Sequence, residues 1–387
     1  MIPVMRPWLG EEEAAAAAAA VASGWVAQGP RVAKFEEAFA AATGAGHAVA
    51  VSSCTTALHL SLVVAGVGPG DEVIVPSLSF IATANAVRYV GAEPVFADVE
   101  LATLNLTAGT IRPHLSGRTR AVILVDQGGV PADLDAVRAL CDPAGVTVIE
   151  DAACAVGATY RGRPVGAGAE LAAFSFHPRK IVTTGEGGMI VTPDGAVAAR
   201  LRRLREHGMD VSAADRHRST QPVIEQYTEV GFNFRMTDIQ AAVGLVQLGK
   251  APAMVARRRE LAARYRRLLS GVPGLRMIAD PFYGTTNFQS CWIMPPGDSP
   301  AVRNEVLRDL AEKGVSARRG IMAAHLEPAY AGHPHGPLPV TEQVASGSLI
   351  LPLFHTMTEA EQDIVVSALC ASLGVPAPAE PAGVSVP

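Results

Sequence analysis

Between residues 47 and 192, short apolar runs alternate with longer stretches that have helical periodicity. The runs are AVAVSS, VIVP, PVFADV, AVILVD, VTVIED, LAAFSF and GGMIVT. Short, uninterrupted apolar runs are typical of strands that are buried on both faces, because helices cover both sides of a parallel sheet. The pattern therefore predicts an α/β fold of three layers, in which a mainly parallel sheet lies between two layers of helices.

The pattern changes twice after this region. Helical periodicity dominates residues 195–270, and we interpret the arginine-rich segment 254–269 as a surface helix with a solvated charged face. After Pro273 the pattern predicts a smaller α+β region that ends near Leu373. We therefore expect a large domain over residues 1–250, a small C-terminal domain over residues 251–373 and a disordered Pro- and Ala-rich tail over residues 374–387.

Composition and charge favour a globular protein that acts on small molecules. Of the 387 residues, 49% are hydrophobic and 18% are charged, which is enough for about two domain cores. The net charge is -5 with mixed signs along the chain, so we expect neither a nucleic-acid partner nor a membrane surface. We also expect no membrane span, and the Ala-rich segment 14–27 follows acidic residues where a signal peptide would carry basic ones.

The cysteines and histidines suggest neither a disulfide framework nor a metal site. The five cysteines are widely spaced and include no CxxC pair, which fits a reduced, cytoplasmic setting. The two histidines of GHPHGP, residues 332–337, lie in a Pro/Gly turn that is typical of a plain loop. We therefore expect no metal ion.

Lysine is rare in this chain, and one lysine lies in an apolar, glycine-rich stretch. The chain has four lysines, and arginines supply the rest of its 32 Lys and Arg residues. Lys180, in FSFHPRKIVTTGEGGM, follows a predicted strand and precedes a glycine cluster. A desolvated lysine can lose its proton and attack a carbonyl, which a guanidinium cannot do. Lys180 is therefore a candidate nucleophile, and the alternative is a solvated lysine at a strand end.

Other polar residues lie at predicted strand ends, the place where parallel sheets bind ligands. Asp151 directly follows the strand VTVIE, where it either caps the next helix or faces a cationic ligand atom. The segment VSSCTTALHL turns from strand to helix, and its hydroxyls and free N–H groups form either a phosphate site or a simple N-cap. An amine, an acid and a phosphate site together fit pyridoxal 5′-phosphate (PLP), which has an aldehyde, a basic ring nitrogen and a phosphate.

Seven segments of the sequence resemble, in order and spacing, the DegT/DnrJ/EryC1/StrS (sugar) aminotransferases. The likeness extends from about residue 2 to residue 373. The segments are GPRVAKFEEAFA, VSSCTTALHL, GVGPGDEVIVPSLSFIATANAV, GAEPVFADV, IEDAACAVGA, FSFHPRKIVTTGEGGM and GFNFRMTDIQAAVGLVQL. The resemblance implies the PLP-dependent transferase fold of type I, with a mainly parallel mixed sheet in the large domain and a smaller C-terminal α+β domain.

The resemblance also implies roles for individual residues. Lys180 matches the lysine that forms the Schiff base, and Asp151 matches the acid that keeps the pyridine nitrogen protonated. Phe80 matches an aromatic residue that stacks on the ring, although the sequence alone would place it in the core. The remaining implied cofactor contacts are the phosphate contacts Cys54, Thr55 and Ser175, Cys154 near the ring hydroxyl, and Asn233, which reaches the phosphate from a second subunit.

The chain departs from the family pattern at three places. Cys54 stands where the family usually has Gly, a change that keeps the backbone N–H contact to phosphate. Cys154 stands where many members have Gln or His, and VDQGG, residues 125–129, replaces the more usual VHxxG. These changes bear on substrate identity and cofactor tuning, and we interpret Cys154 as a small packed residue in preference to a reactive one.

The resemblance implies a PLP-dependent transaminase of class EC 2.6.1 with a ping-pong mechanism, in which PLP and pyridoxamine phosphate (PMP) alternate. L-Glutamate is the expected donor, and a nucleotide-linked keto sugar of the 3- or 4-keto-6-deoxyhexose type is the expected acceptor. Arg319 and His325, in ARRGIMAAHLEPAY, are the candidate substrate residues. The resemblance further implies a cytoplasmic homodimer with shared active sites that works in amino-sugar biosynthesis and secondary metabolism.

Other functions remain open at this point. The acceptor can be a cyclitol or another natural-product ketone, and the chain can be a non-catalytic PLP-binding regulatory protein. Some relatives are dehydratases, but those have His at the lysine position, and Lys180 argues against that activity. A nucleotide-binding module built on TGEGG is disfavoured, because neither GxxxxGK[ST] nor a strand-borne GxGxxG is present.

Overall fold

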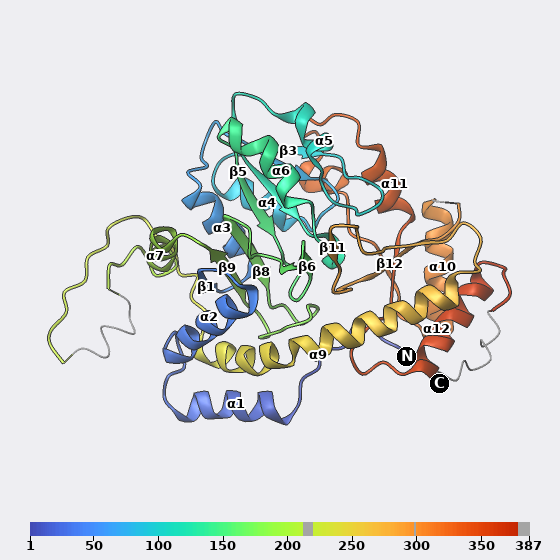
Figure 1. The fold of residues 1–387 in the computed structure, drawn as a ribbon, viewed down its shortest axis with the longest axis horizontal. Coiled ribbons are helices and arrows are strands. Elements are labelled where there is room, and N and C mark those ends of the chain that lie inside the picture. The colour runs from blue at the N-terminus through green and yellow to red at the C-terminus, as the bar shows by residue number, and fades with distance from the viewer. Residues whose placement is uncertain (212–219, 298, 378–387) are drawn as a thin grey trace.

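A computed structural model describes residues 1–211, 220–297 and 299–377 of the chain (Figure 1). The expected disordered tail lies mostly outside the described residues. A sheet of seven strands forms the centre of the large part of the fold, in the order β1-β9-β8-β5-β4-β2-β3. The strands are β1 His47–Val51, β2 Glu72–Pro76, β3 Glu93–Ala97, β4 Thr119–Val125, β5 Thr147–Asp151, β8 Leu171–Ser175 and β9 Gly188–Thr192.

The sheet is mixed because one strand runs against the others. Strand β9 pairs antiparallel with β1 and β8, and all other pairs in the sheet are parallel. Alternate residues of each strand enter different cores: in β4, Ile123 packs into one cluster and Leu124 into the other. Both faces of the sheet are therefore buried, which confirms the predicted three-layer α/β fold.

Helices cover the two faces of this sheet. On one face lie α3 Cys54–Val64, α4 Ala82–Tyr89 and α7 Gly195–Leu204, which share a core with the sheet. On the other face lie α2 Pro30–Thr43, α6 Leu134–Cys141 and the long α9 Asp238–Leu269. Helix α1 Glu11–Ala22 lies along α9 on the side away from the sheet (Figure 1). The short α5 Ala108–Ile111 lies on the connection between β3 and β4.

A buried carboxylate fixes how α2 meets α9. Helix α2 begins after Gly29, which has no side chain to cap the free N–H groups of the first turn. Asp238, the first residue of α9, supplies the cap: Oδ1 accepts from the N–H groups of Gly29 and Val32 at 2.8 and 3.0 Å, and Oδ2 accepts from Arg31 at 3.1 Å. Asp238 is fully buried, so these bonds replace its hydration shell.

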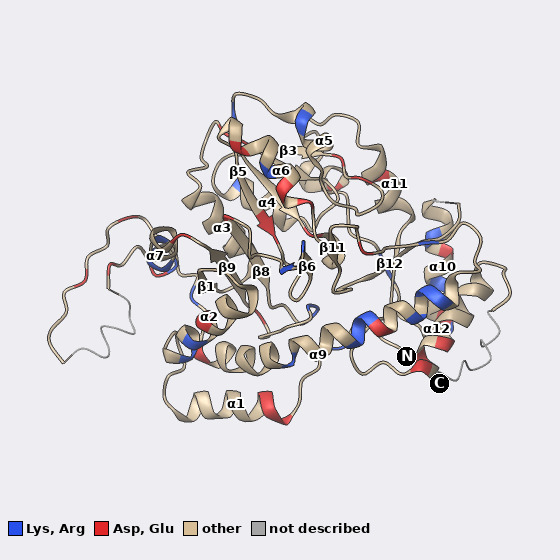
Figure 2. Ribbon diagram, viewed as in Figure 1, with Lys and Arg blue, Asp and Glu red and all other residues tan. Residues whose placement is uncertain are grey.

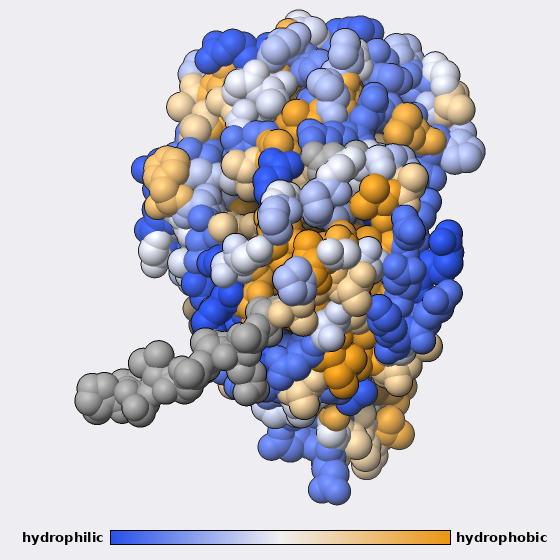
Figure 3. All heavy atoms as spheres, turned by 90° about the vertical axis from the view of Figure 1, so that its right-hand side faces the viewer, coloured by the Kyte–Doolittle hydropathy of each residue, from blue (hydrophilic) through white to orange (hydrophobic). Residues whose placement is uncertain are grey.

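The C-terminal part of the chain forms a second, smaller sheet. Its order is β10-β12-β14-β13, with β10 Arg276–Met277, β12 Cys291–Met294, β13 Arg318–Arg319 and β14 Leu349–Leu351. It lies with α10 Pro300–Glu312, α11 Pro339–Gly347 and α12 Glu359–Ser372. A further small sheet joins β11 Gly284–Thr285 to β6 Thr159–Tyr160 and β7 Arg163–Pro164. The face of the molecule on the side of α10 and α12 carries apolar areas between polar ones (Figure 3).

Helix α9 runs without interruption from the large sheet to the C-terminal part (Figure 1). The expected domain boundary at residues 250 and 251 falls inside it, so the proposed division remains a prediction. By length and composition α9 is also long and apolar enough to cross a membrane, contrary to the expectation from sequence. Core helices of globular proteins pass the same test, and the second half of α9 carries many charges (Figure 2). There, Arg264 pairs with Asp363 of α12 at 2.7 Å.

Candidate active site

A cavity of about 830 Å³ lies where the carboxyl ends of β5 and β8 meet the start of α3. This is the edge at which parallel sheets bind ligands. The residues predicted from sequence that line it are Cys54, Thr55, Phe80, Asp151, Cys154, Ser175, Lys180 and Arg319. Positions separated by as many as 265 residues in the chain are therefore brought to one place by the fold.

Lys180 lies in the loop after β8. Its backbone N–H donates to the carbonyl of His177 at 2.8 Å, which makes a tight turn, and Nζ lies 3.1 Å from Sγ of Cys154. Burial by itself lowers the pKa of Lys180, but Cys154, Cys54 and Asp151 outweigh it, and the net pKa is raised. Lys180 is therefore desolvated, as expected from sequence, while its anionic and sulfur neighbours favour the ammonium over the free amine.

Asp151 ends β5 and is 5% exposed. Its Oδ2 accepts from the hydroxyl of Thr83 at 3.2 Å and its Oδ1 accepts from the N–H of Ala153 at 3.2 Å. Burial raises the pKa of Asp151, and Lys180 and the two hydrogen bonds oppose that rise. A turn follows β5 where a helix start was one of two possibilities, so Asp151 caps no helix and points its carboxylate into the cavity.

The start of α3 forms another wall of the cavity. Ser53 is the N-cap, and its Oγ accepts from the N–H of Thr56 at 3.2 Å. The N–H groups of Cys54 and Thr55 lie in the first turn, where a helix has no carbonyl acceptors of its own. These groups and the helix dipole make this end of the cavity suitable for an anion. Ser175 lies at the end of β8 and lines the same cavity.

The glycine cluster after Lys180 has a steric role that the sequence did not reveal. Gly188 pairs with Val51 at the end of β1, next to the first turn of α3. A Cβ atom at residue 188 would lie 2.4 Å from the backbone carbonyl carbon of Ser53. Glycine at this position therefore lets β9 approach the helix start that forms the anion-binding end of the cavity.

Phe80 lies on the cavity wall, in the loop after β2, and is 58% exposed. A large aromatic side chain left this exposed next to a cavity indicates a surface that a flat ligand can cover. The sequence alone would have placed Phe80 in the core. Its exposure here follows from its place at the end of PSLSF, beyond the last buried residue of the strand.

Two predicted residues lie outside the cavity lining. His325 is buried: its Nδ1 lies 2.6 Å from the hydroxyl of Ser77, and its Nε2 lies 3.5 Å from a carboxylate oxygen of Glu342. Burial lowers the pKa of His325, which favours the neutral, structural form. Asn233 is exposed and bridges to Glu206 after α7, away from the cavity.

Two amides that sequence analysis missed hold the loops of the site. Oε1 of Gln289 accepts from the N–H of Ile181 at 3.0 Å, and its Nε2 donates to the carbonyl of Arg179 at 2.6 Å, so Gln289 holds both neighbours of Lys180. Nδ2 of Asn287 donates to the carbonyl of Cys154 at 2.8 Å. The segment NFQSCW contains no pattern that marks these residues, since their partners are more than 100 positions away.

The segment that carries these amides is itself held in place. Phe288 has a φ of 50°, a left-handed conformation that costs a non-glycine residue about 1–2 kcal/mol. Arg258 of α9 donates from Nε to the carbonyl of Phe288 at 2.8 Å and from Nη2 to the carbonyl of Gln289 at 2.7 Å. Gly129 leaves the space that Asn287 occupies, because a Cβ there would overlap the Asn287 amide. This gives the unusual VDQGG segment a structural role.

Arginines surround the mouth of the cavity. Arg179, Arg318 and Arg319 all line it. Burial lowers the pKa of Arg318, and the nearby positive charge of Arg179 lowers it further. Arg319 is 3.8 Å from Glu327 and its side chain is 58% exposed. The cavity is therefore suited to two anions, one at the start of α3 and one beside the three arginines.

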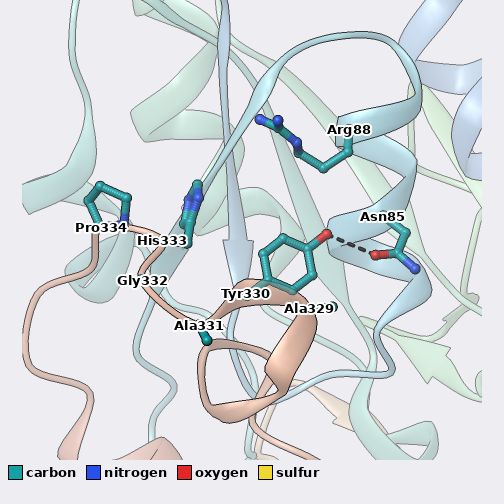
Figure 4. A pocket seen from close by; sticks show the side chains of 8 residues that line it. All are labelled: Asn85, Arg88, Ala329, Tyr330, Ala331, Gly332, His333 and Pro334. Carbon is teal, nitrogen blue, oxygen red and sulfur yellow. Dashed lines mark hydrogen bonds between the residues drawn. The ribbon is translucent and has the colours of Figure 1, made fainter.

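A second, more open hollow of about 460 Å³ lies between α4 and residues 329–334 (Figure 4). There the hydroxyl of Tyr330 donates to Oδ1 of Asn85 at 2.8 Å, and Arg88 is paired with Glu93. None of the residues predicted to carry chemistry lines this hollow. Among the described residues, no group of three or more His, Cys, Asp or Glu could hold a metal ion.

Comparison with known proteins agrees with this geometry. The chain matches the model of the DegT/DnrJ/EryC1/StrS aminotransferase family over residues 7–370. A similar solved structure is the aminotransferase TlmJ from Streptoalloteichus hindustanus, with 39% identity, a TM-score of 0.89, and coverage of 97% of this chain and 99% of that chain. The sugar aminotransferase CalS13 from Micromonospora echinospora has 30% identity, a TM-score of 0.87, and coverage of 96% and 100%. A 3-amino-5-hydroxybenzoic acid synthase has 30% identity, a TM-score of 0.87, and coverage of 97% and 99%.

Proposed function

Because the chain belongs to the DegT/DnrJ/EryC1/StrS aminotransferase family, it is a PLP-dependent transaminase, and we propose that it moves an amino group from L-glutamate to a nucleotide-linked keto sugar. The observation that carries this proposal is the convergence of Lys180, Asp151 and the first turn of α3 on one cavity. These are an amine, a buried acid and an anion site, which match the aldehyde, the ring nitrogen and the phosphate of the cofactor.

We assign the cavity residues to the cofactor as follows. When bound, PLP supplies a carbonyl that captures amines and a ring that takes up electrons. Lys180 would hold the carbonyl end, and Asp151 would keep the ring nitrogen protonated. Phe80 would cover one face of the ring, with Cys154 beside the ring hydroxyl. The proposed phosphate contacts are Cys54, Thr55 and Ser175.

In this proposal Lys180 also carries the proton. Its amine would be released when the donor amine takes its place on the cofactor carbonyl, and it would then move the proton from the α-carbon of the donor to the cofactor, with the reverse transfer for the acceptor. The released amine takes up a proton readily, because the anionic and sulfur neighbours that raise the pKa of Lys180 favour its ammonium. Asp151 is buried and hydrogen-bonded to Thr83, which would fix its carboxylate against the ring nitrogen.

The arginines at the mouth support an anionic substrate. The carboxylates of glutamate and the diphosphate of a nucleotide sugar both accept paired hydrogen bonds from a guanidinium. We propose that Arg318 and Arg319 bind these groups, with Arg179 adding positive charge. Changing Arg318 to Gln should raise KM about 10–150-fold, which corresponds to the loss of one charge-assisted hydrogen bond of about 1.5–3 kcal/mol. Changing Arg267, an exposed arginine of α9 outside the cavity, to Gln is the matched control.

A cyclic ketone without a nucleotide is the second candidate acceptor. Much of the inner wall is aliphatic, with Met5, Leu307, Ile321, Met322 and Leu353 among the lining residues. The similarity to a 3-amino-5-hydroxybenzoic acid synthase, whose name indicates a carbocyclic product, also favours this acceptor class. Assays with a panel of keto sugar nucleotides, and in parallel with cyclitol ketones, decide between the two.

We further propose that the protein is a homodimer in the cytoplasm that serves amino-sugar biosynthesis in secondary metabolism. Residues 220–230, between α7 and α9, extend away from the rest of the fold (Figure 1), and Ile224, Tyr227 and Val230 among them are 89%, 62% and 89% exposed. Exposed apolar side chains of this size suit a surface that another subunit covers. Asn233, which lies outside the cavity of its own chain, would then reach the phosphate site of a second copy.

The decisive test is the absorption spectrum of the protein with PLP before and after L-glutamate is added. We expect a visible band that glutamate converts to a near-ultraviolet band, together with formation of 2-oxoglutarate. A band that glutamate leaves unchanged would reject glutamate as the donor and favour another amine or a regulatory protein. The absence of any band would reject the cofactor assignments made above.

A further inference from the structure

The pocket contains a lysine and a cysteine that are close enough to react with each other. Nζ of Lys180 lies 3.1 Å from Sγ of Cys154, within contact distance and with no atom between them. Cys154 is partly exposed and lines the cavity of about 830 Å³, so a small oxidant can reach its sulfur. We propose that Cys154 and Lys180 form an oxidative cross-link, a sulfenamide S–N bond, when a peroxide enters the pocket and the cofactor is absent.

The reaction balances with hydrogen peroxide as the only oxidant. The peroxide takes two electrons from the Cys154 thiol and gives a sulfenic acid and one water. Lys180 gives up a proton to water, and the nitrogen of its free amine then attacks this sulfur. The S–O bond breaks, the hydroxyl leaves with a proton from nitrogen as a second water, and the S–N bond forms. The protein loses two hydrogen atoms overall, and two equivalents of an added thiol restore the free thiol and amine.

Geometry favours Cys154 over the other thiol in the pocket. Cys54 has its Sγ 4.0 Å from the carboxylate of Asp151, and burial together with that charge raises the pKa of the Cys54 thiol well above its ordinary value. A thiol that stays protonated reacts slowly with peroxide, because the thiolate is the nucleophile. Cys154 instead has its Sγ 3.1 Å from Nζ of Lys180, so the attacking nitrogen already lies beside this sulfur. Asn287 holds its backbone carbonyl, which keeps the sulfur in place.

The cross-link goes beyond the proposed transamination, because it modifies the residue on which that activity depends. A nitrogen bound to sulfur cannot capture the carbonyl of a cofactor. The modified protein would therefore be unable to load PLP until a thiol reduced it. Loaded protein would resist the modification, since the Lys180 amine is then engaged.

The test uses the full chain without cofactor, treated with a small excess of hydrogen peroxide. We expect intact-mass spectrometry to show the loss of two hydrogen atoms, peptide mapping to join Cys154 to Lys180, and dithiothreitol to reverse both changes. The Cys154→Ser protein should show no cross-link, and the Cys54→Ser protein should form it like the wild type. Far-ultraviolet circular dichroism on both variants checks that they are folded.

Other outcomes would overturn the proposal. A Cys54–Cys154 disulfide gives the same mass change but would join different peptides and would disappear in Cys54→Ser. Addition of oxygen atoms to Cys154, with Lys180 still cut by trypsin, would show that the amine does not attack. The same treatment after incubation with PLP should suppress the cross-link. If the protein fails to bind PLP, the proposed function fails, and the cofactor-free arms still decide the cross-link.

Discussion

Replacing Gln289 by Leu tests whether the loop that carries Lys180 is held by a single side chain. Leucine keeps about the same volume but can neither accept from the N–H of Ile181 nor donate to the carbonyl of Arg179. Ile181 is 4% exposed, so removing the acceptor of its N–H leaves a buried donor unpaired, at a cost of about 1–3 kcal/mol. Arg179 is exposed, so its carbonyl can accept a hydrogen bond from water in place of Gln289. Losing the bond from Gln289 therefore costs about 0.5–1.5 kcal/mol.

The total of about 1.5–4.5 kcal/mol can appear either as lost folding stability or as a displaced loop. If the loop stays in position, the free energy of unfolding falls by this amount. If the loop shifts toward the cavity that it lines, folding stability is largely kept and Nζ of Lys180 moves. A displacement of about 1 Å from the reacting geometry costs on the order of 100-fold in rate. We expect the second result, because a loop beside a cavity has room to relax.

The assay compares kcat and KM of the glutamate half-reaction with the unfolding free energy, for Gln289→Leu and the conservative Gln289→Glu. The Gln289→Glu side chain keeps an acceptor for the N–H of Ile181 but places a second acceptor against the carbonyl of Arg179. The kcat of this variant should therefore lie between that of Gln289→Leu and that of the wild type. The pH titration of the visible cofactor band gives a separate readout. A Leu variant with wild-type kcat and titration but a lower unfolding free energy would refute the positioning role.

Three further predictions follow from individual side chains. Lys180→Ala should abolish turnover, whereas the phosphate contacts should retain part of the affinity for PLP. Single-turnover kinetics measure the rate and equilibrium dialysis measures the PLP affinity. Near wild-type rates would contradict the assignment of Lys180. Burial raises the pKa of Glu150 to about 7, above its unfolded value of 4.5, so the stability that Glu150 contributes below pH 4.5 is lost as pH rises through 7. The loss is about 3 kcal/mol in the free energy of unfolding, measured by urea unfolding at a series of pH values. Glu150→Gln should flatten this part of the pH profile, and an unchanged profile would contradict the argument. Asp238→Ala removes three hydrogen bonds from the start of α2 and should lower the unfolding free energy by about 3–5 kcal/mol, whereas a loss below 1 kcal/mol would show that water replaces the carboxylate.

The parts of the fold with local signals could be predicted from the sequence. Uninterrupted apolar runs identify strands buried on both faces, and the ends of those strands place Asp151 and Ser175 at the edge where a ligand binds. Lys180 stood out because lysine is rare in this chain and its neighbours are apolar residues and glycines. These properties belong to a few consecutive residues, which is why a pattern can reveal them.

The parts that depend on long-range contacts could not be predicted. Gln289 acts on backbone atoms 108 and 110 residues away, and nothing in NFQSCW indicates that contact. His325 was a candidate substrate residue because of its neighbours in the sequence, but its ring packs on Ser77, 248 residues away. The sign of the pKa shift of Lys180 was also out of reach, because it depends on Cys54 at the start of α3, Asp151 at the end of β5 and Cys154 in the turn after β5.

The position of Arg258 on α9 has a consequence for how this enzyme can be divided. α9 is one helix of 32 residues, about 48 Å long, and its second half holds the backbone of residues 288 and 289 through Arg258. The side chain of Gln289 in turn holds both neighbours of Lys180. The reactive lysine is thus encoded in one half of the chain and supported by the other, so a chimera that exchanges the C-terminal half to change the acceptor must keep Arg258, Asn287 and Gln289 as a unit.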